Sequence, residues 1–252
     1  MDLSDLSAEA LAAHLGARPL RTYPALLSTD AEALAWARSG APEGAVVVAG
    51  YQASPRGRGG KIWDLDPARN LGFSLVVRPQ WPAFREGWLY TVVVSALADV
   101  IGTEATIEWP DEVRVDGRMA ASVGVYVDLA ERLTSFAVAT ALVVDAPMPR
   151  GPLLARLLTA IDSRYRADSD AVIGDYLPRC ETIGRRVRAC MVPLGPLGPV
   201  IEGRAVSTLL DGSLVLETDE GRRIAARPQH LAVLEEASIP TAGSSPAPQS
   251  PV

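Results

Sequence analysis

Three cations and four glycines are interleaved in one short segment, residues 50–63, which reads GYQASPRGRGGKIW. The cations are Arg56, Arg58 and Lys61, and no acidic residue follows until Asp64. Glycine lets a backbone approach a ligand closely, and arginine presents forked N–H donors that suit oxyanions. The segment therefore predicts a loop that clamps a phosphate or an adenylate. On these residues alone, a solvated flexible loop is an equally good interpretation.

Two familiar phosphate-binding loops do not fit this segment. A P-loop ends in Gly-Lys-Ser/Thr, whereas Lys61 is followed by Ile62. The dinucleotide fingerprint opens a helix, and this loop does not. Instead, valine-rich apolar runs at residues 44–52 and 70–79 predict buried strands on both sides of it.

The composition of the chain narrows the classes of function. Its 252 residues carry a net charge of −6, and 48% of them are hydrophobic. An acidic protein lacks the basic surface that nucleic acids require, so we expect no nucleic-acid partner. No apolar run is long enough to span a bilayer, and the N-terminus lacks the order of a signal peptide. We therefore expect no membrane partner and a cytoplasmic location.

Histidine and cysteine are too scarce for several kinds of active site. The two histidines, His14 and His230, offer little to a zinc site or a Ser-His-Asp triad. The two cysteines, Cys180 and Cys190, lack a metal-ligand partner nearby and suit a reducing cytoplasm. We therefore expect neither a zinc enzyme nor a serine hydrolase.

Helical and strand patterns alternate through most of the chain. Capping residues and apolar spacing predict helices at residues 7–16, 28–40, 87–102 and 151–167. The third of these contains many valines, which favour strand, but its length and closing glycine favour a buried helix. The Asp116-Gly117 pair within residues 111–129 predicts a tight β-hairpin.

The pattern changes near residue 198. Residues 198–236 alternate apolar and polar side chains between Gly-containing turns, which predicts a small β-barrel. Residues 237–252 are rich in proline and serine, which predicts a disordered tail. The expected organisation is an N-terminal helical extension (1–19), a main α+β domain (20–190), the barrel and the tail.

The glycine and arginine loop resembles the ligand-binding loop of bacterial biotin protein ligases, in the biotin/lipoate ligase family. The family pattern is Gln-Thr-Ala-Gly-Arg-Gly-Arg-Arg-Gly-Arg-x-Trp, and residues 52–63 read Gln-Ala-Ser-Pro-Arg-Gly-Arg-Gly-Gly-Lys-Ile-Trp. Residues 28–30 resemble the family's Ser-Thr-Asn segment, and residues 108–112 resemble its Lys-Trp-Pro-Asn-Asp hairpin. The resemblance extends in order over residues 20–236.

This resemblance implies a class II synthetase-like mixed sheet flanked by helices, with a C-terminal Src-homology-3-like barrel. It also implies a catalytic domain that condenses biotin with ATP to biotinyl-AMP, then transfers biotin to a lysine of a carrier domain. The implied ligands are ATP, Mg²⁺ and biotin or biotinyl-AMP. The implied partner is a biotin carboxyl carrier-type domain, and a homodimer stays open.

The family pattern also implies where each ligand binds. The residues that would hold biotin, its carboxylate and the adjoining phosphate are Ser28, Thr29, Gln52, Arg56, Gly57 and Arg58. Those that would contact the nucleotide are Trp63, Trp109 and Asp111, and Glu112 would hold Mg²⁺. The arginines would converge on one concavity, in a loop that is mobile when empty. Replacing Arg58 by alanine would then hardly change thermal stability, because an exposed loop arginine packs against little.

Several departures from the family pattern fall on its chemistry. The family lysine after the hairpin aligns with Met119, or with Arg118 if a one-residue gap is allowed. Asp111 replaces an asparagine and adds a negative charge where ATP phosphates would lie. The family's Gly-Ile-Gly-Ile-Asn-Val strand becomes Ala-Thr-Ala-Leu-Val-Val at residues 139–144. We therefore expect a biotin ligase homologue with impaired or absent activity.

Two other interpretations remain open. The chain is an active divergent ligase if Arg118 takes over from the lysine. It is a non-catalytic scaffold that binds a carrier domain or another partner if only the fold has been kept. Turnover of ATP separates the first from the others, and stabilisation by ligand separates binding from a bare scaffold.

Overall fold

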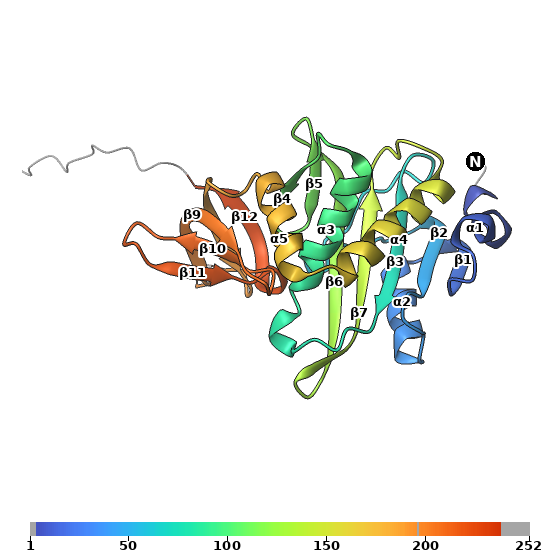
Figure 1. Ribbon diagram of the computed structural model, residues 1–252, viewed down its shortest axis with the longest axis horizontal. Coiled ribbons are helices and arrows are strands. Elements are labelled where there is room, and N and C mark those ends of the chain that lie inside the picture. The colour runs from blue at the N-terminus through green and yellow to red at the C-terminus, as the bar shows by residue number, and fades with distance from the viewer. Residues whose placement is uncertain (1–3, 196, 238–252) are drawn as a thin grey trace, which may run out of the picture.

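A seven-stranded sheet forms the larger part of the molecule (Figure 1). The computed structural model describes residues 4–195 and 197–237. The strand order is β1-β2-β3-β7-β6-β5-β4. The strands are β1 (Leu20–Leu26), β2 (Val46–Gln52), β3 (Leu71–Val77), β4 (Thr106–Glu108), β5 (Glu112–Val115), β6 (Arg118–Ala130) and β7 (Leu133–Val143). Only β1 and β2 are parallel neighbours, so the sheet is mixed.

Helices cover both faces of this sheet. They are α1 (Ala8–Leu15), α2 (Thr29–Arg38), α3 (Trp88–Ile101), α4 (Arg150–Arg166) and α5 (Ser169–Tyr176). One face packs against α3, whose residues from Trp88 to Ala98 are all buried, and α3 in turn contacts α4 and α5. The other face packs against Ala33 and Ala37 of α2 through Val47, Val76 and Val138. Within the described residues, no helix combines the length and apolar character needed to cross a bilayer.

The segment 87–102 is helical despite its valines. Its side chains meet sheet residues on one side and α4 on the other, so an all-round apolar helix can be buried here. Gly102 then ends the helix with φ 142°, a conformation that glycine adopts readily. Tertiary burial therefore outweighs the strand preference of valine.

A second, antiparallel sheet of five strands follows in the order β11-β10-β9-β8-β12. Its strands are β8 (Arg186–Met191), β9 (Val200–Thr208), β10 (Leu214–Glu217), β11 (Arg223–Ala226) and β12 (Leu231–Glu236). The predicted fold class, a mixed sheet with flanking helices and a small C-terminal β unit, is confirmed. The expected boundary at residue 190 is misplaced, because β8 pairs with β9 and β12 instead of joining the large sheet. Most of the predicted tail, residues 238–252, lies outside the described residues.

The N-terminal segment is fixed to the start of α4. Arg150, which is 6% exposed, donates from Nε to Asp5 at 2.9 Å. Leu6 and Leu11 are buried in the main hydrophobic core. The N-terminal helical extension therefore packs against the large unit through residues 5–11.

Close contacts join the C-terminal sheet to the larger unit. The Nε1 of Trp109, next to β4, donates to the carbonyl of Gly212 at 2.9 Å. A Cβ atom on Gly212 would lie 2.3 Å from the carbonyl oxygen of Gly87, at the start of α3. The turn between β9 and β10 therefore requires glycine both for its φ of 80° and for this contact.

We expect Gly212→Ala to lower the free energy of unfolding more than Gly221→Ala does. Both glycines have positive φ, but a Cβ on Gly221 meets nothing within 4 Å. The steric conflict with Gly87 should add about 1–3 kcal/mol to the loss at Gly212. Urea denaturation of the two variants measures the difference, and equal losses would contradict the close contact between Gly212 and Gly87.

Candidate functional site

The glycine and arginine loop folds back on itself between β2 and β3. The Gly57 N–H donates to the carbonyl of Lys61 at 2.8 Å, and the Trp63 N–H donates to the carbonyl of Pro55 at 2.9 Å. A single 3₁₀ turn, Arg58–Gly60, forms the tip. These bonds hold the loop as a compact unit.

Two glycines allow the loop to lie against the sheet. A Cβ on Gly124 of β6 would come within 2.9 Å of the Gly57 carbonyl carbon, so the two backbones touch. A Cβ on Gly57 would lie 2.5 Å from the indole ring of Trp63. Trp63 is only 7% exposed and fills the inside of the loop. This position favours a packing role for Trp63. Little of its ring is exposed for the predicted contact with a nucleotide.

A cavity of about 300 Å³ lies beneath the loop, on the α2 side of the sheet. The lining includes Asp30, Arg56, Tyr90, Tyr126 and Thr140. Burial raises the pKa of Tyr90, so its hydroxyl stays protonated, and it accepts a hydrogen bond from the Val125 N–H at 3.3 Å. The cavity therefore offers an exposed guanidinium at the loop and hydroxyl groups along the sheet.

A chain of polar side chains runs behind this cavity. The Thr29 N–H donates to Gln52 Oε1 at 2.8 Å, and Ser74 Oγ donates to Thr29 Oγ1 at 2.9 Å. Ser74 Oγ also lies 2.8 Å from Thr140 Oγ1, at the cavity wall. Ser28 caps α2 beside them by accepting from the Ala31 N–H. The structure thus brings Ser28, Thr29 and Gln52 together, each at most 5% exposed.

Ser74 and Thr140 were missed as site residues from the sequence. Both interrupt apolar strands, LGFSLVV and LTSFAVATALV, at buried positions. A buried hydroxyl in such a run needs a hydrogen-bond partner, and that requirement was the available signal.

Arg58 lies away from the cavity that Arg56 lines. It borders a second hollow of about 330 Å³, between the β4–β5 hairpin and β12. Its Nε donates to Asp111 Oδ1 at 3.0 Å, and its Nη1 donates to the carbonyl of Leu231. The prediction that Arg56 and Arg58 converge on one concavity is therefore wrong, because Asp111 and β12 hold Arg58 on the other side of the loop.

Burial dominates the electrostatics of Asp111. Desolvation raises the pKa of its carboxyl, although Arg58 beside it acts in the opposite direction. The two side chains are only 13% and 14% exposed. Arg58 is consequently paired within the protein. Arg56 is exposed, and among the described residues its guanidinium bonds only to the carbonyl of Gly60, at 3.3 Å.

The remaining hairpin residues are also engaged. Trp109 is 2% exposed and bonded to Gly212, and Glu112 Oε2 accepts from Arg114 at 3.0 Å. Within residues 4–195 and 197–237, no three His, Cys, Asp or Glu side chains are grouped to hold a metal ion. Glu112 is paired with Arg114, and its assignment as a Mg²⁺ ligand stays a prediction.

Arg118 and Met119 lie in a third place. They border a hollow of about 320 Å³ with Ile101 and Val143, and no residue of this hollow lines either of the other two. The structure therefore does not bring either candidate for the family lysine to the two loop arginines.

Comparison with known proteins finds biotin ligases among the relatives of this chain. The chain is 29% identical over 217 residues to the biotin–[acetyl-CoA-carboxylase] ligase of Mycobacterium tuberculosis, covering 75% of this chain and 80% of the relative. It is 24% identical over 238 residues to the bifunctional ligase/repressor BirA of Bacillus subtilis, covering 79% and 69%. Both relatives are named biotin ligases, and the chain is similar to them over 75% and 79% of its length. No family model matches it.

Solved biotin protein ligases share the fold. The Aquifex aeolicus enzyme in complex with biotin and ATP superimposes with a TM-score of 0.65 at 18% identity, covering 87% of this chain and 99% of the other. A biotin protein ligase-like protein of unknown function from Silicibacter sp. gives 0.62 at 13% identity, covering 84% and 95%. The two-sheet arrangement is therefore that of biotin protein ligases.

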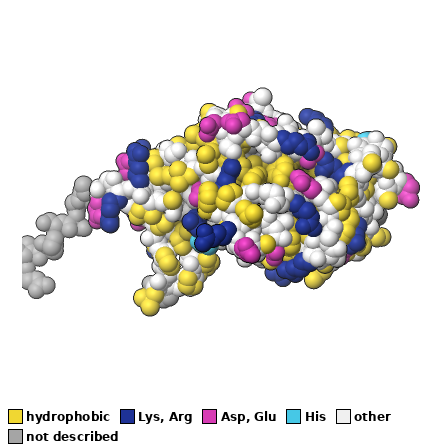
Figure 2. Space-filling view, turned by 60° about the horizontal axis from the view of Figure 1, so that its bottom comes forward, with side chains coloured by type: hydrophobic (Ala, Val, Ile, Leu, Met, Phe, Trp, Pro, Cys, Tyr) yellow, Lys and Arg dark blue, Asp and Glu magenta, His cyan; other side chains and the backbone are white. Residues whose placement is uncertain are grey.

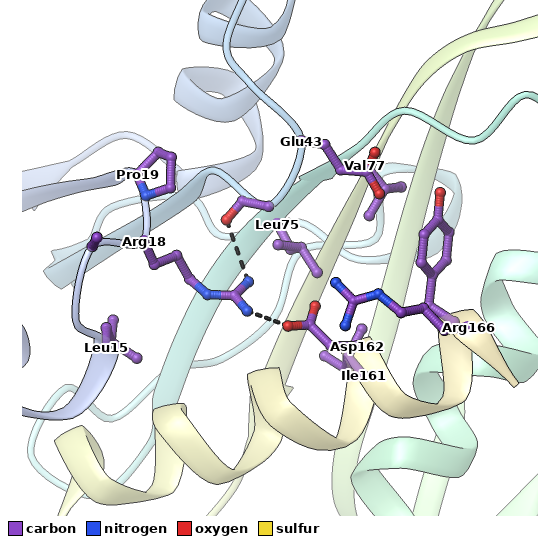
Figure 3. Close-up of a pocket in the computed structure, with 12 residues that line it drawn as sticks. Leu15, Arg18, Pro19, Glu43, Leu75, Val77, Ile161, Asp162 and Arg166 are labelled. Atoms are coloured by element: carbon purple, nitrogen blue, oxygen red, sulfur yellow. Dashed lines mark hydrogen bonds and ion pairs between the residues drawn. The ribbon is translucent and has the colours of Figure 1, made fainter.

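A larger hollow than these three contains none of the predicted site residues in its lining. It measures about 700 Å³ and lies between the α1–β1 connection and α4 (Figure 3). Arg18 crosses it, bonded to Asp162 and to the carbonyl of Gly44 (Figure 3). The pairing explains why this arginine is held in place, and the site under the loop remains the candidate.

We expect Arg58→Ala to destabilise the protein and Arg56→Ala to leave its stability almost unchanged. Arg58→Ala removes the ion pair with Asp111 and the hydrogen bond to β12. Their loss should lower the free energy of unfolding by about 1–3 kcal/mol. This corrects the expectation that Arg58→Ala is silent. Thermal and urea unfolding of both variants tests it, and equal midpoints would contradict the ion pair.

We expect Thr140→Val to lower the unfolding free energy by about 1 kcal/mol, because it removes one link of the buried hydroxyl chain. Thr134→Val is the matched control. Thr134 lies on the same strand, is 2% exposed, and its Oγ1 has no hydrogen-bond partner among the described residues. Its substitution should be neutral or stabilising, and a loss at Thr134 equal to that at Thr140 would count against the chain.

Proposed function

We propose that this biotin protein ligase homologue has retained a biotin-type pocket and has impaired or absent ligase activity. The observation that carries the proposal is the largely shielded ion pair of Arg58 and Asp111, with Nε and Oδ1 3.0 Å apart. A guanidinium that already holds a carboxylate contributes little to a phosphate. The family reaction depends on such donors around the charge that develops at phosphorus.

The pocket half of the proposal rests on the polar chain and Arg56. We assign the head group of biotin to Ser28, Thr29 and Gln52, reached through Thr140, and its carboxylate to Arg56. Arg56 and Thr140 line the 300 Å³ cavity, and hydrogen bonds through Ser74 and Thr29 connect Thr140 to Gln52 behind it. The solved Aquifex aeolicus ligase binds biotin and ATP, which supports this choice of ligand class.

In the hollow assigned to the nucleotide, most of the positive charges are already paired with carboxylates. In the second hollow, Arg58 pairs with Asp111, and Arg114 pairs with both Glu108 and Glu112. Lys61 is the remaining cation in its lining. Phosphates entering this hollow would meet three carboxylates, so we infer weak binding of ATP. Burial also raises the pKa of Glu108, and Arg114 beside it favours the ionised form.

The proposed chemistry follows the family reaction in outline. The carboxylate of biotin attacks the α-phosphorus of ATP and pyrophosphate leaves, and a carrier lysine then displaces AMP from the acyl carbon. In this chain, Arg56 and the loop amides would orient the carboxylate and shield it from water. Residues able to neutralise the pentacoordinate phosphorus would be Arg58 and Lys61, and only Lys61 is free of an internal ion pair within the described range.

Transfer of biotin to a carrier domain tests the proposal. With biotin, Mg²⁺ and ATP, we expect turnover about 100-fold or more below that of a ligase with the full motif, since one lost donor alone has that effect. Restoring lysine at Met119 should not rescue it, because Asp111 still occupies Arg58. Robust wild-type turnover would instead favour the active divergent ligase, which the 29% identity to a named ligase supports.

We further propose a carrier-type domain as partner and the cytoplasm as location. Cys180 and Cys190 are free thiols, which suits a reducing compartment. Lys and Arg side chains lie among acidic and apolar ones on the face shown in Figure 2, an arrangement that does not favour nucleic acid. Stabilisation by biotin would distinguish a ligand-binding protein from a bare scaffold, and a homodimer remains open.

A further inference from the structure

The two loop arginines differ in what already binds them. Arg58 donates from Nε to Asp111 and from Nη1 to the carbonyl of Leu231, so its guanidinium joins the loop, the β4–β5 hairpin and β12. Arg56 forms no ion pair within the described residues, and its one hydrogen bond is to a carbonyl of its own loop. One arginine is therefore occupied by an anion and the other is available.

Asp111 binds Arg58 as an anionic ligand would. Its carboxylate is an oxyanion that accepts from the Nε–H of the guanidinium, a group that also binds phosphate oxygens. The pair is largely shielded from water, at 13% and 14% side-chain exposure, so solvent does not weaken it as it weakens surface pairs. A phosphate must break this pair before it can use Arg58.

The loop places the two arginines in separate hollows. Arg56 faces the cavity of about 300 Å³ under the loop, and Arg58 faces the hollow of about 330 Å³ beside the hairpin. The hollows share no lining residue, so a small anion in the first need not disturb Asp111. A ligand carrying phosphate into the second must displace it.

We propose that Asp111 sets the anion selectivity of the arginine loop. Its carboxylate competes internally for Arg58, so the protein binds a monocarboxylate at Arg56 and disfavours phosphate-bearing ligands at Arg58. The same pair holds the loop folded while the site is empty, which replaces the expectation of a mobile empty loop. The inference deepens the proposed function and rests on it for the identity of the monocarboxylate.

Calorimetric titration of wild type and Asp111→Asn with two probes, biotin and pyrophosphate, tests this selectivity. Asparagine keeps the shape of the side chain and an acceptor for Arg58, but it removes the competing charge. We expect pyrophosphate affinity to rise about 10-fold or more, the effect of freeing one charge-assisted hydrogen bond, and biotin affinity to change less than about 2-fold.

Two variants isolate the cause. Glu112→Gln removes the same charge from the same hollow, but Glu112 pairs with Arg114 and not with Arg58, so we expect less than about 3-fold change in pyrophosphate affinity. In the double variant Asp111→Asn/Arg58→Ala the gain should vanish, because it acts through Arg58. Hydrogen exchange should also be faster at the loop amides of Gly57 and Gly60 in Asp111→Ala than in wild type.

The outcomes are distinct. The proposal is overturned if Asp111→Asn leaves the affinity for pyrophosphate unchanged or undetectable. It is also overturned if the affinities for biotin and pyrophosphate rise equally in Asp111→Asn, or if Glu112→Gln raises the affinity for pyrophosphate as much as Asp111→Asn does. If Asp111→Asn binds pyrophosphate more tightly through Arg58 while neither wild type nor the variant binds biotin, the role of Asp111 is supported and the proposed biotin pocket is wrong. If biotin binds and the pyrophosphate gain is missing, the proposed pocket stands and the role of Asp111 fails.

Discussion

The backbone of the arginine loop rests directly on β6, and this contact decides how the rest of the site is arranged. Gly57 and Gly124 have no side chains between them, and a Cβ on Gly124 would lie 2.9 Å from the Gly57 carbonyl carbon. Because the loop is pressed against the sheet at this point, side chains on either side of Gly57 must leave in different directions. Arg56 reaches the cavity under the loop, and Arg58 reaches the hairpin and β12.

Because Arg58 points away from Arg56, it comes within reach of Asp111. The Asp111 carboxylate, which replaces an amide of the family pattern, accepts from the Arg58 guanidinium at 3.0 Å, and the two side chains are only 13% and 14% exposed. Burial disfavours the charged form of Asp111, so the protein tolerates an electrostatic cost here that an asparagine would avoid. In the second hollow, the charge of Arg58 is neutralised by Asp111. In the cavity under the loop, Arg56 has no ion pair among the described residues. The two arginines of one loop thus stand in different electrostatic surroundings.

The C-terminal sheet takes part in this arrangement. Its β12 supplies the carbonyl of Leu231 to Arg58, and its β9–β10 turn supplies the carbonyl of Gly212 to Trp109. The small unit therefore helps to fix both the arginine loop and the hairpin. Its distance from the loop in the sequence hides this role, since the partners of Arg58 lie 53 and 173 residues away.

Local sequence determined the elements of the fold and the type of site. Apolar periodicity and end signals predicted most helices and strands, and Asp116-Gly117 predicted the β5–β6 turn, where both residues have positive φ. The glycine and arginine loop and the Ser-Thr and Gln segments pointed to the biotin ligase family. These features depend on residues close in the chain, for which backbone conformation and side-chain period are sufficient evidence.

Only the tertiary structure decided which of these residues work together. It separated Arg56 from Arg58, paired Arg58 with Asp111, moved Arg118 and Met119 to another hollow, and joined β8 to the C-terminal sheet. It also added Ser74 and Thr140 to the polar chain. Each outcome depends on contacts between distant segments and on which groups lose water when they pack. Sequence patterns report local conformation, whereas a buried ion pair is settled by competition among all the groups that the fold brings within reach.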